Sequence, residues 1–257
     1  MTRPIIENPQ LDGSTFSLNG SGDTGILLFH GFTSTTVEVR PLAEFLHQAG
    51  YSVTAPLLPG HGTRPEDALR VRKADWLSAA DQAYQSLKTR ARKVVVGGES
   101  MGALLALHLA SAYPDISGIV TYAPAIQVSG QWRAVLLAPF VQIRPKYYLH
   151  EESSTTPPDT LPWQGYNVLP IPAVAQFYWL QQQVRQELKS VRQPALIFQG
   201  KLDGTINPDG AKTVLDRLGS QDKKLIWLEN SGHTLLLGEQ HHQVYQDTLA
   251  FIQRVTQ

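Results

Sequence analysis

The chain has 257 residues and 42% of them are hydrophobic, so it can bury a core of domain size and is neither a mini-protein nor a disordered tail. Its 22 Lys and Arg residues balance its 22 Asp and Glu residues, and this zero net charge gives no indication of a nucleic-acid partner or an anionic membrane. The absence of cysteine excludes a disulfide framework, a thiolate zinc site, an iron–sulfur cluster and a cysteine nucleophile. Any covalent nucleophile must therefore be an oxygen or a nitrogen.

The N-terminal residues show no apolar segment of the kind that a signal peptide contains, and no run reaches about eighteen consecutive apolar residues. We therefore expect a soluble, cytoplasmic protein without stable membrane insertion. The sequence does not predict its oligomeric state.

Short apolar runs of strand length alternate with amphipathic helical segments along most of the chain. Before them, only Phe16 and Leu18 alternate as in a strand. Helices are expected from the capping-box spacing at Thr35–Glu38 to Gly50, and from Asp75, a candidate N-cap, to Leu87. This alternation predicts an α/β fold with a mostly parallel sheet. Further strands are expected at 26–29, 51–59, 94–96, 119–122, 195–198 and 225–228, and further helices at 103–112 and 244–252.

About seventy residues between the expected strands 119–122 and 195–198 break this alternation, which is too long for an ordinary connection. We place an inserted, mainly helical cap at 127–190 and the core at 1–126 and 191–257. One amphipathic helix is expected around Val174–Leu188, and five prolines between Pro157 and Pro172 indicate an irregular loop. Nine of the 22 aromatic residues fall in the insertion, where they form either a small second core or the lining of a pocket.

The motif Gly98-Glu99-Ser100-Met101-Gly102 has the pattern G-x-S-x-G and lies directly after an expected buried strand and before an expected helix. A sharp turn between strand and helix strains the serine backbone, so the two glycines are needed to let the chain pass closely. The turn would present the serine oxygen to solvent. The helix that starts at Met101 would direct its unpaired N–H groups at an oxyanion formed there.

A serine needs a base to take its proton, and the base needs an acid to orient it. Asp203 follows the strand expected at 195–198, and His233 follows the strand expected at 225–228. Both therefore fall at the carboxyl edge of the sheet, in the chain order serine, acid, histidine. His30-Gly31-Phe32 ends a strand at the same edge, so the Phe32 N–H can be a second oxyanion donor beside that of Met101.

Other polar residues are weaker candidates for catalytic roles. His30 and His61 are expected to hold loops through hydrogen bonds to the backbone, and Glu99 to tune the local polarity. No histidine and carboxylate set has the spacing of metal ligands, and no G-x-G-x-x-G fingerprint follows a strand, so we expect no metal and no other cofactor. The rivals of the candidate acid and base are Asp209, Asp222, His241 and His242, with both histidines expected on the surface.

Nearly the whole chain resembles the α/β-hydrolase superfamily and, within it, the bacterial carboxylesterase and monoacylglycerol lipase group. The resemblance implies a mostly parallel central sheet flanked by helices, with a helical cap over an acyl pocket. Its matching segments are 30–33, 58–62, 98–102, 200–203 and 231–233, and Ala103 departs from it where many relatives have a third glycine. The roles that it implies are nucleophile for Ser100, acid for Asp203, base for His233, and oxyanion-hole amides for Phe32 and Met101.

Together these observations predict a serine carboxylesterase that hydrolyses short- to medium-chain carboxylic esters or monoacylglycerols through an acyl-enzyme on Ser100. Its expected partner is a small-molecule ester, with no nucleic acid. The same triad could also serve a carbon–carbon bond hydrolase or an acyltransferase. A ligand-binding protein without catalysis is a further alternative, because function depends on the site and not on the fold.

Overall fold

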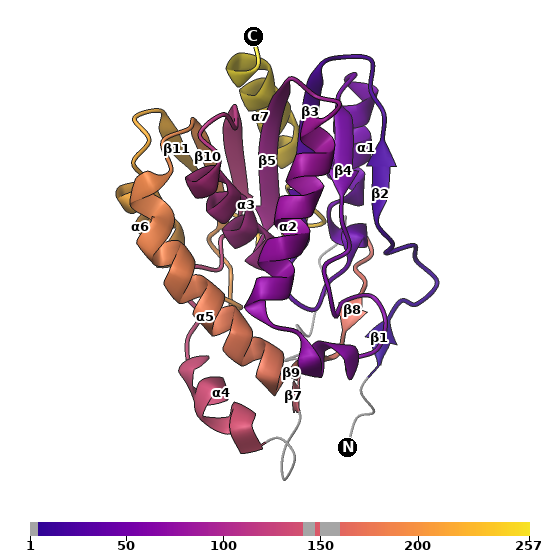
Figure 1. The fold of residues 1–257 in the computed structure, drawn as a ribbon, viewed down its shortest axis with the longest axis vertical. Coiled ribbons are helices and arrows are strands. Elements are labelled where there is room, and N and C mark those ends of the chain that lie inside the picture. Colours follow the sequence, from indigo (N-terminus) through magenta and orange to yellow (C-terminus); the bar gives the residue numbers. More distant parts are fainter. Residues whose placement is uncertain (1–4, 141–146, 150–159) are drawn as a thin grey trace.

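The computed structural model describes residues 5–140, 147–149 and 160–257, and its centre is a seven-stranded sheet (Figure 1). The strand order is β11-β10-β6-β5-β3-β4-β2, and each neighbouring pair is parallel except β2 with β4. The mostly parallel sheet is therefore confirmed. Its strands are β2 (Phe16–Leu18), β3 (Thr24–Phe29), β4 (Ser52–Ala55), β5 (Lys93–Glu99), β6 (Gly118–Tyr122), β10 (Ala195–Gly200) and β11 (Lys223–Leu228).

Helices cover both faces of the sheet. α2 (Lys73–Lys88), α3 (Met101–Ala112) and α6 (Asp209–Arg217) lie on one face, and α1 (Arg40–Gln48) and α7 (His241–Val255) lie on the other (Figure 1). Among the described residues, no helix combines the length and the apolar character that crossing a bilayer requires.

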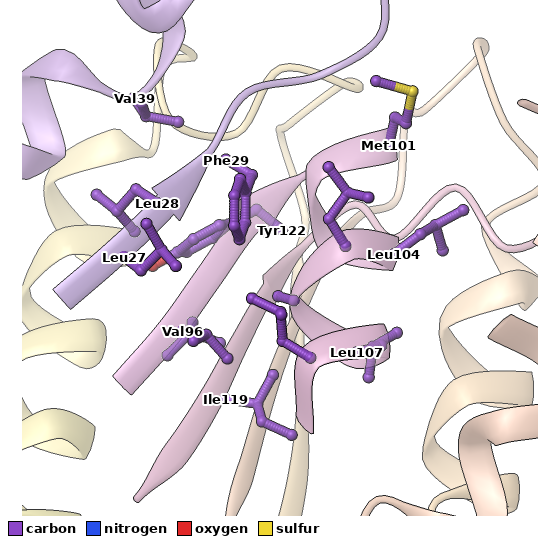
Figure 2. Packing of buried hydrophobic residues seen from close by; sticks show 14 of the residues in the cluster. Leu27, Leu28, Phe29, Val39, Val96, Met101, Leu104, Leu107, Ile119 and Tyr122 are labelled. Atoms are coloured by element: carbon purple, nitrogen blue, oxygen red, sulfur yellow. The ribbon is translucent and has the colours of Figure 1, made fainter. Parts of the chain in front are cut away.

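The central strands are buried along their length because helices cover them on both sides, and this explains their continuous apolar sequence. Val96 and Ile119 on the strands, and Leu104 and Leu107 on α3, belong to one hydrophobic cluster (Figure 2). The core therefore holds the end of β5 and the start of α3 firmly, and Ser100 lies between them.

The first helix begins later than predicted. Thr35 accepts a hydrogen bond from the Val37 N–H and opens a 3-10 turn over Thr36–Glu38, whereas α1 starts at Arg40 with Pro41 in its first turn. Pro41 is tolerated there because N–H groups of the first turn have no helical acceptor. The predicted capping box is wrong, because the Glu38 carboxyl group accepts the Gly31 N–H and not the backbone N–H of the N-cap residue.

The second helix begins earlier than predicted. α2 starts at Lys73, so Asp75 is the third helical residue and not the N-cap. The Asp75 carboxylate accepts the N–H of Arg72 at 2.8 Å, which satisfies an amide that the helix itself leaves unpaired. The amphipathic character predicted for this helix is confirmed, with Trp76, Tyr84 and Leu87 buried.

Between β6 and β10 the described residues contain two helices and three short strands near the carboxyl edge of the sheet (Figure 1). The helix predicted around Val174–Leu188 is confirmed as α5, except that Leu188 falls in the 3-10 turn after it. α5 packs against α4, α3 and α2, and part of the proline-rich loop expected from Pro157 lies outside the described residues. The elements are α4 (Trp132–Leu137), β7 (Tyr147–Leu149), β8 (Gly165–Tyr166), β9 (Val168–Pro170) and α5 (Ile171–Glu187), and β8 pairs with β1 (Ile6–Glu7).

Candidate active site

Ser100 forms the turn between β5 and α3 in a backbone conformation that side chains rarely adopt, with φ 56° and ψ −112°. The flanking glycines are required by contact distances. A Cβ at Gly98 would lie 2.4 Å from the carbonyl carbon of Gly102, and a Cβ at Gly102 would lie 2.2 Å from the oxygen of Phe29. The predicted role of these glycines is confirmed. Ser100, which was expected to present its oxygen to solvent, is only 8% exposed as a residue.

The structure brings Ser100, His233 and Asp203 together in one chain of hydrogen bonds. Nε2 of His233 lies 3.0 Å from Oγ of Ser100, and Nδ1 of His233 lies 2.8 Å from Oδ2 of Asp203. The loops that carry the acid and the histidine are tied to each other, because the Leu202 N–H donates to the Ser231 carbonyl at 3.0 Å. The geometry is that of a nucleophile, a base and an orienting acid.

Four donors surround the Asp203 carboxylate. Oδ1 accepts the backbone N–H groups of Thr205 and Ile206 at 2.9 and 3.1 Å, and Oδ2 accepts Nε2 of Gln199 at 2.9 Å as well as Nδ1 of His233. Burial alone would raise the pKa of Asp203, but the hydrogen bonds, first of all that from His233, outweigh it and hold the pKa below its ordinary value. Asp203 is therefore ionised at neutral pH.

The turn at Gly31 and Phe32 passes directly against the nucleophile. A Cβ at Gly31 would lie 3.3 Å from the Cβ of Ser100, so a side chain there would require its neighbours to shift by a few tenths of an ångström. Met101 is the first residue of α3, and its N–H therefore has no acceptor within the helix. The Phe32 ring lies 5.2 Å from the ring of Phe177 on α5, between centroids. Both candidate oxyanion residues thus lie beside Ser100.

Residues 21–241 match the model of the family described as serine aminopeptidase, S33. The chain belongs to this family. It is 33% identical to a thermostable monoacylglycerol lipase of Bacillus sp. (strain H-257), over 95% of this chain and 96% of the relative. It is 28% identical to a carboxylesterase of Bacillus subtilis (strain 168), over 93% of this chain and 96% of the relative.

A solved structure confirms the fold of this S33 family member. It was reported in work on LipS and LipT, two metagenome-derived lipolytic enzymes, and it superposes on this chain with a TM-score of 0.87 at 29% sequence identity. The superposition covers 94% of this chain and 98% of the solved one. The chain has the α/β-hydrolase fold, as its motifs predicted.

The rivals of the candidate acid and base have other partners. Asp209 pairs with Lys212 on α6, and Asp222 pairs with Arg254 on α7. His241 is buried with its Nδ1 against the Gly238 carbonyl, so the expectation that it lies on the surface is wrong; its ring packs edge-on against Tyr245. None of these side chains contacts Ser100.

Sequence reasoning missed Gln199 and Glu38. Gln199 lies in an apolar strand and Glu38 in an expected capping box, so neither carried a signal for the site. The structure links Gln199 to the site through its contact with Asp203, and Glu38 through its contact with Gly31. The described residues contain no cluster of three His, Cys, Asp or Glu side chains that could hold a metal ion.

His30 and His61 form hydrogen bonds with backbone groups of nearby loops, as predicted. Nδ1 of His30 contacts the Gly31 carbonyl at 2.9 Å, while its Nε2 accepts the Leu58 N–H at 3.0 Å. Nδ1 of His61 contacts the Pro59 carbonyl at 3.0 Å. Burial, helped by the charge of His61, lowers the pKa of His30 to about 3, and burial lowers that of His61 to about 4. Both rings are therefore neutral at neutral pH.

The buried neutral state of His61 predicts a specific pH dependence of stability. Between its unfolded pKa of about 6.5 and its folded pKa, the unfolded chain binds a proton that the folded chain does not, so the free energy of unfolding falls as the pH falls. His61→Phe should be less stable than the wild type at pH 7.5, because the Pro59 carbonyl loses the contact with His61 and keeps only the hydrogen bond that Nε1 of Trp76 donates among the described residues. This difference should shrink by about 2 kcal/mol between pH 7.5 and 4.5 in urea unfolding. Parallel pH curves for the two proteins would contradict the assignment.

Proposed function

We propose that this S33 family member is a serine carboxylesterase that hydrolyses short- to medium-chain carboxylic esters or monoacylglycerols. The observation that carries the proposal is the chain of hydrogen bonds from Ser100 through His233 to Asp203. The relatives named monoacylglycerol lipase and carboxylesterase support an ester over other acyl substrates, since they cover nearly the whole chain.

In the proposed mechanism Oγ of Ser100 attacks the ester carbonyl carbon, and Nε2 of His233 takes the hydroxyl proton. The carbonyl oxygen becomes an oxyanion, which the N–H groups of Phe32 and Met101 stabilise. When the intermediate collapses, the imidazolium gives its proton to the departing alcohol and the acyl group stays on Ser100. His233 then takes a proton from water, whose hydroxide attacks the acyl carbon. When this second intermediate collapses, the bond from the acyl carbon to Oγ breaks, the imidazolium returns its proton to Oγ, and the acid leaves. Asp203 holds the imidazole and stabilises its charged form throughout.

An apolar acyl chain fits the surroundings of Phe32. Phe32 packs against the main core and also against a small second cluster of buried residues from α4 and α5, and Phe177 of α5 faces its ring. We propose that residues 127–190 form a cap over the acyl chain and that these side chains line its pocket. The second cluster is Ala134, Ile171, Val174 and Ala175.

The test is a series of p-nitrophenyl esters of increasing acyl length, with a p-nitroanilide of the best acyl group beside them. We expect kcat/KM to peak at short or medium chains, because a pocket of fixed length gains about 0.8 kcal/mol per buried methylene until it is full. The anilide should be hydrolysed at least a hundredfold more slowly. A flat acyl profile would contradict the pocket, and a faster anilide would contradict esterase function and favour the aminopeptidase activity in the family description.

A further inference from the structure

Two carboxyl groups that the proposed mechanism does not use are buried on either side of Ser100. Glu99 is fully buried directly before the nucleophile, and Glu38 is 5% exposed. Neither pairs with a lysine or arginine among the described residues. Burying a carboxyl group without a cation is costly unless hydrogen bonds offset the cost. The bonds that these two groups accept therefore show what each of them holds.

Glu99 holds the loop that carries the histidine. Its Oε1 accepts the backbone N–H groups of Leu235, through a short bond, and of Leu236, at 3.3 Å. These two leucines follow His233 by two and three residues, and both are buried in the main core. The bonds join the residue before the nucleophile to the turn after the base. They therefore restrain the distance between Ser100 and His233.

Glu38 holds the turn that carries the candidate oxyanion amide. Its Oε2 accepts the Gly31 N–H at 2.5 Å, on the peptide that precedes the one carrying the Phe32 N–H. A Cβ at Gly31 would touch both Glu38, at 3.1 Å from Oε2, and Ser100, at 3.3 Å from Cβ. Gly31 is thus enclosed between this carboxyl group and the nucleophile, and a rotation of its peptide would also rotate that of Phe32.

We propose that Glu99 and Glu38 are positioning residues for the esterase reaction, Glu99 for the base His233 and Glu38 for the oxyanion donor Phe32, and that each acts by accepting backbone hydrogen bonds. The inference rests on the proposed function, because it assigns these residues to the same site.

The charges around the pair indicate that accepted hydrogen bonds, and not a negative charge, are what the site needs. Burial raises the pKa of Glu99 well above its usual range, and the negative charge of Glu38 raises it further. Burial also raises the pKa of Glu38. Oε2 of Glu99 has no hydrogen-bond partner among the described residues, so a proton on this oxygen leaves Oε1 free to accept both N–H groups. An uncharged amide oxygen should therefore replace the carboxyl group of Glu99.

The experiment compares Glu99→Leu with Glu99→Gln on the best p-nitrophenyl ester. Leucine removes the acceptor at similar volume, so kcat should fall by about 10- to 100-fold while KM changes less than threefold, as expected for misplaced groups in a formed pocket. Glutamine keeps an acceptor and should retain at least about a third of kcat. Glu38→Leu should show the same loss of kcat. Glu187→Gln, which removes a carboxylate from the His108 contact between α3 and α5, is the control and should keep full kcat.

Two results would overturn the proposal: kcat of folded Glu99→Leu within threefold of wild type, or Glu99→Gln no faster than Glu99→Leu. Melting temperatures and circular dichroism establish which variants fold. If neither leucine variant folds, Glu99→Gln decides the matter, since a tenfold loss of its kcat would show that a neutral acceptor does not suffice.

Labelling with a fluorophosphonate separates this proposal from the esterase assignment. The reagent phosphonylates an activated serine whatever the natural substrate is, so its second-order rate with Ser100 reports the positioning of the base and the oxyanion donors directly. Fast labelling of the wild type with no ester turnover would refute the substrate assignment alone. In that case a labelling rate at least tenfold lower in Glu99→Leu, with recovery in Glu99→Gln, would still support the positioning role, and equal rates would refute it.

Discussion

Replacing Ser100 with alanine should lower kcat/KM for an ester by about 10⁴- to 10⁶-fold. Without Oγ no acyl-enzyme forms, and only the binding pocket and the oxyanion donors remain to accelerate the attack of water. The fold should persist, because the strained backbone at φ 56° suits alanine no worse than serine, and the Ser100 N–H keeps its bond to the Tyr122 carbonyl. Initial rates on the best p-nitrophenyl ester, with circular dichroism and a melting curve, test both expectations.

The matched control for this variant is Ser111→Ala. Ser111 lies near the end of α3, the helix that follows the nucleophile, and its hydroxyl donates only to the carbonyl of His108. Its removal should leave kcat/KM within twofold of the wild-type value. If Ser100→Ala retained more than about 1% of wild-type activity after purification free of other esterases, Ser100 would not be the nucleophile.

The sheet and the proximity of Ser100, Asp203 and His233 could be predicted from the sequence because their signals are local. A continuous apolar run such as Leu27–Phe29 is buried on both faces wherever it pairs, and two glycines around Ser100 are needed wherever a strand turns sharply into a helix. Asp203 and His233 follow strands that run parallel, so one edge of the sheet brings them together. Periodicity and strand ends carry this information without any knowledge of distant contacts.

The supporting residues could not be predicted, because Glu99 depends on a pairing distant in the chain and Glu38 on a choice between two nearby donors. Glu99 bonds to residues more than a hundred positions away, and nothing around it in the sequence indicates Leu235 or Leu236. Glu38 matched a local rule, the capping box, but the turn at Gly31 offered its carboxyl group a different donor. The prediction that Asp75 is an N-cap was wrong for a similar local reason, since a carboxylate suits both the N-cap and the third helical position.

Asp203→Asn should be nearly as damaging as the loss of the nucleophile, and the donors around the carboxylate explain why. Both Asp203 oxygens accept only from N–H groups: Oδ1 from Thr205 and Ile206, and Oδ2 from Gln199 and His233. An asparagine would keep its oxygen on the two backbone amides, which cannot move without unfolding the loop, and would turn its NH₂ group toward His233. An NH₂ group can only donate there, so Nδ1 of the imidazole must give up its proton and accept.

The proton then moves to Nε2, which faces Ser100 and can no longer accept from Oγ. We therefore expect kcat to fall by about 10³- to 10⁴-fold at neutral pH with an intact fold, and ¹⁵N NMR of the imidazole to show the Nε2–H tautomer in place of Nδ1–H. The control is Asp209→Asn on α6, which should leave kcat unchanged, because that carboxylate pairs with Lys212 in the first turn of the helix and not with His233. If Asp203→Asn kept more than a tenth of kcat, the carboxylate would serve only to hold the Thr205–Ile206 loop, and His233 would be oriented by another group.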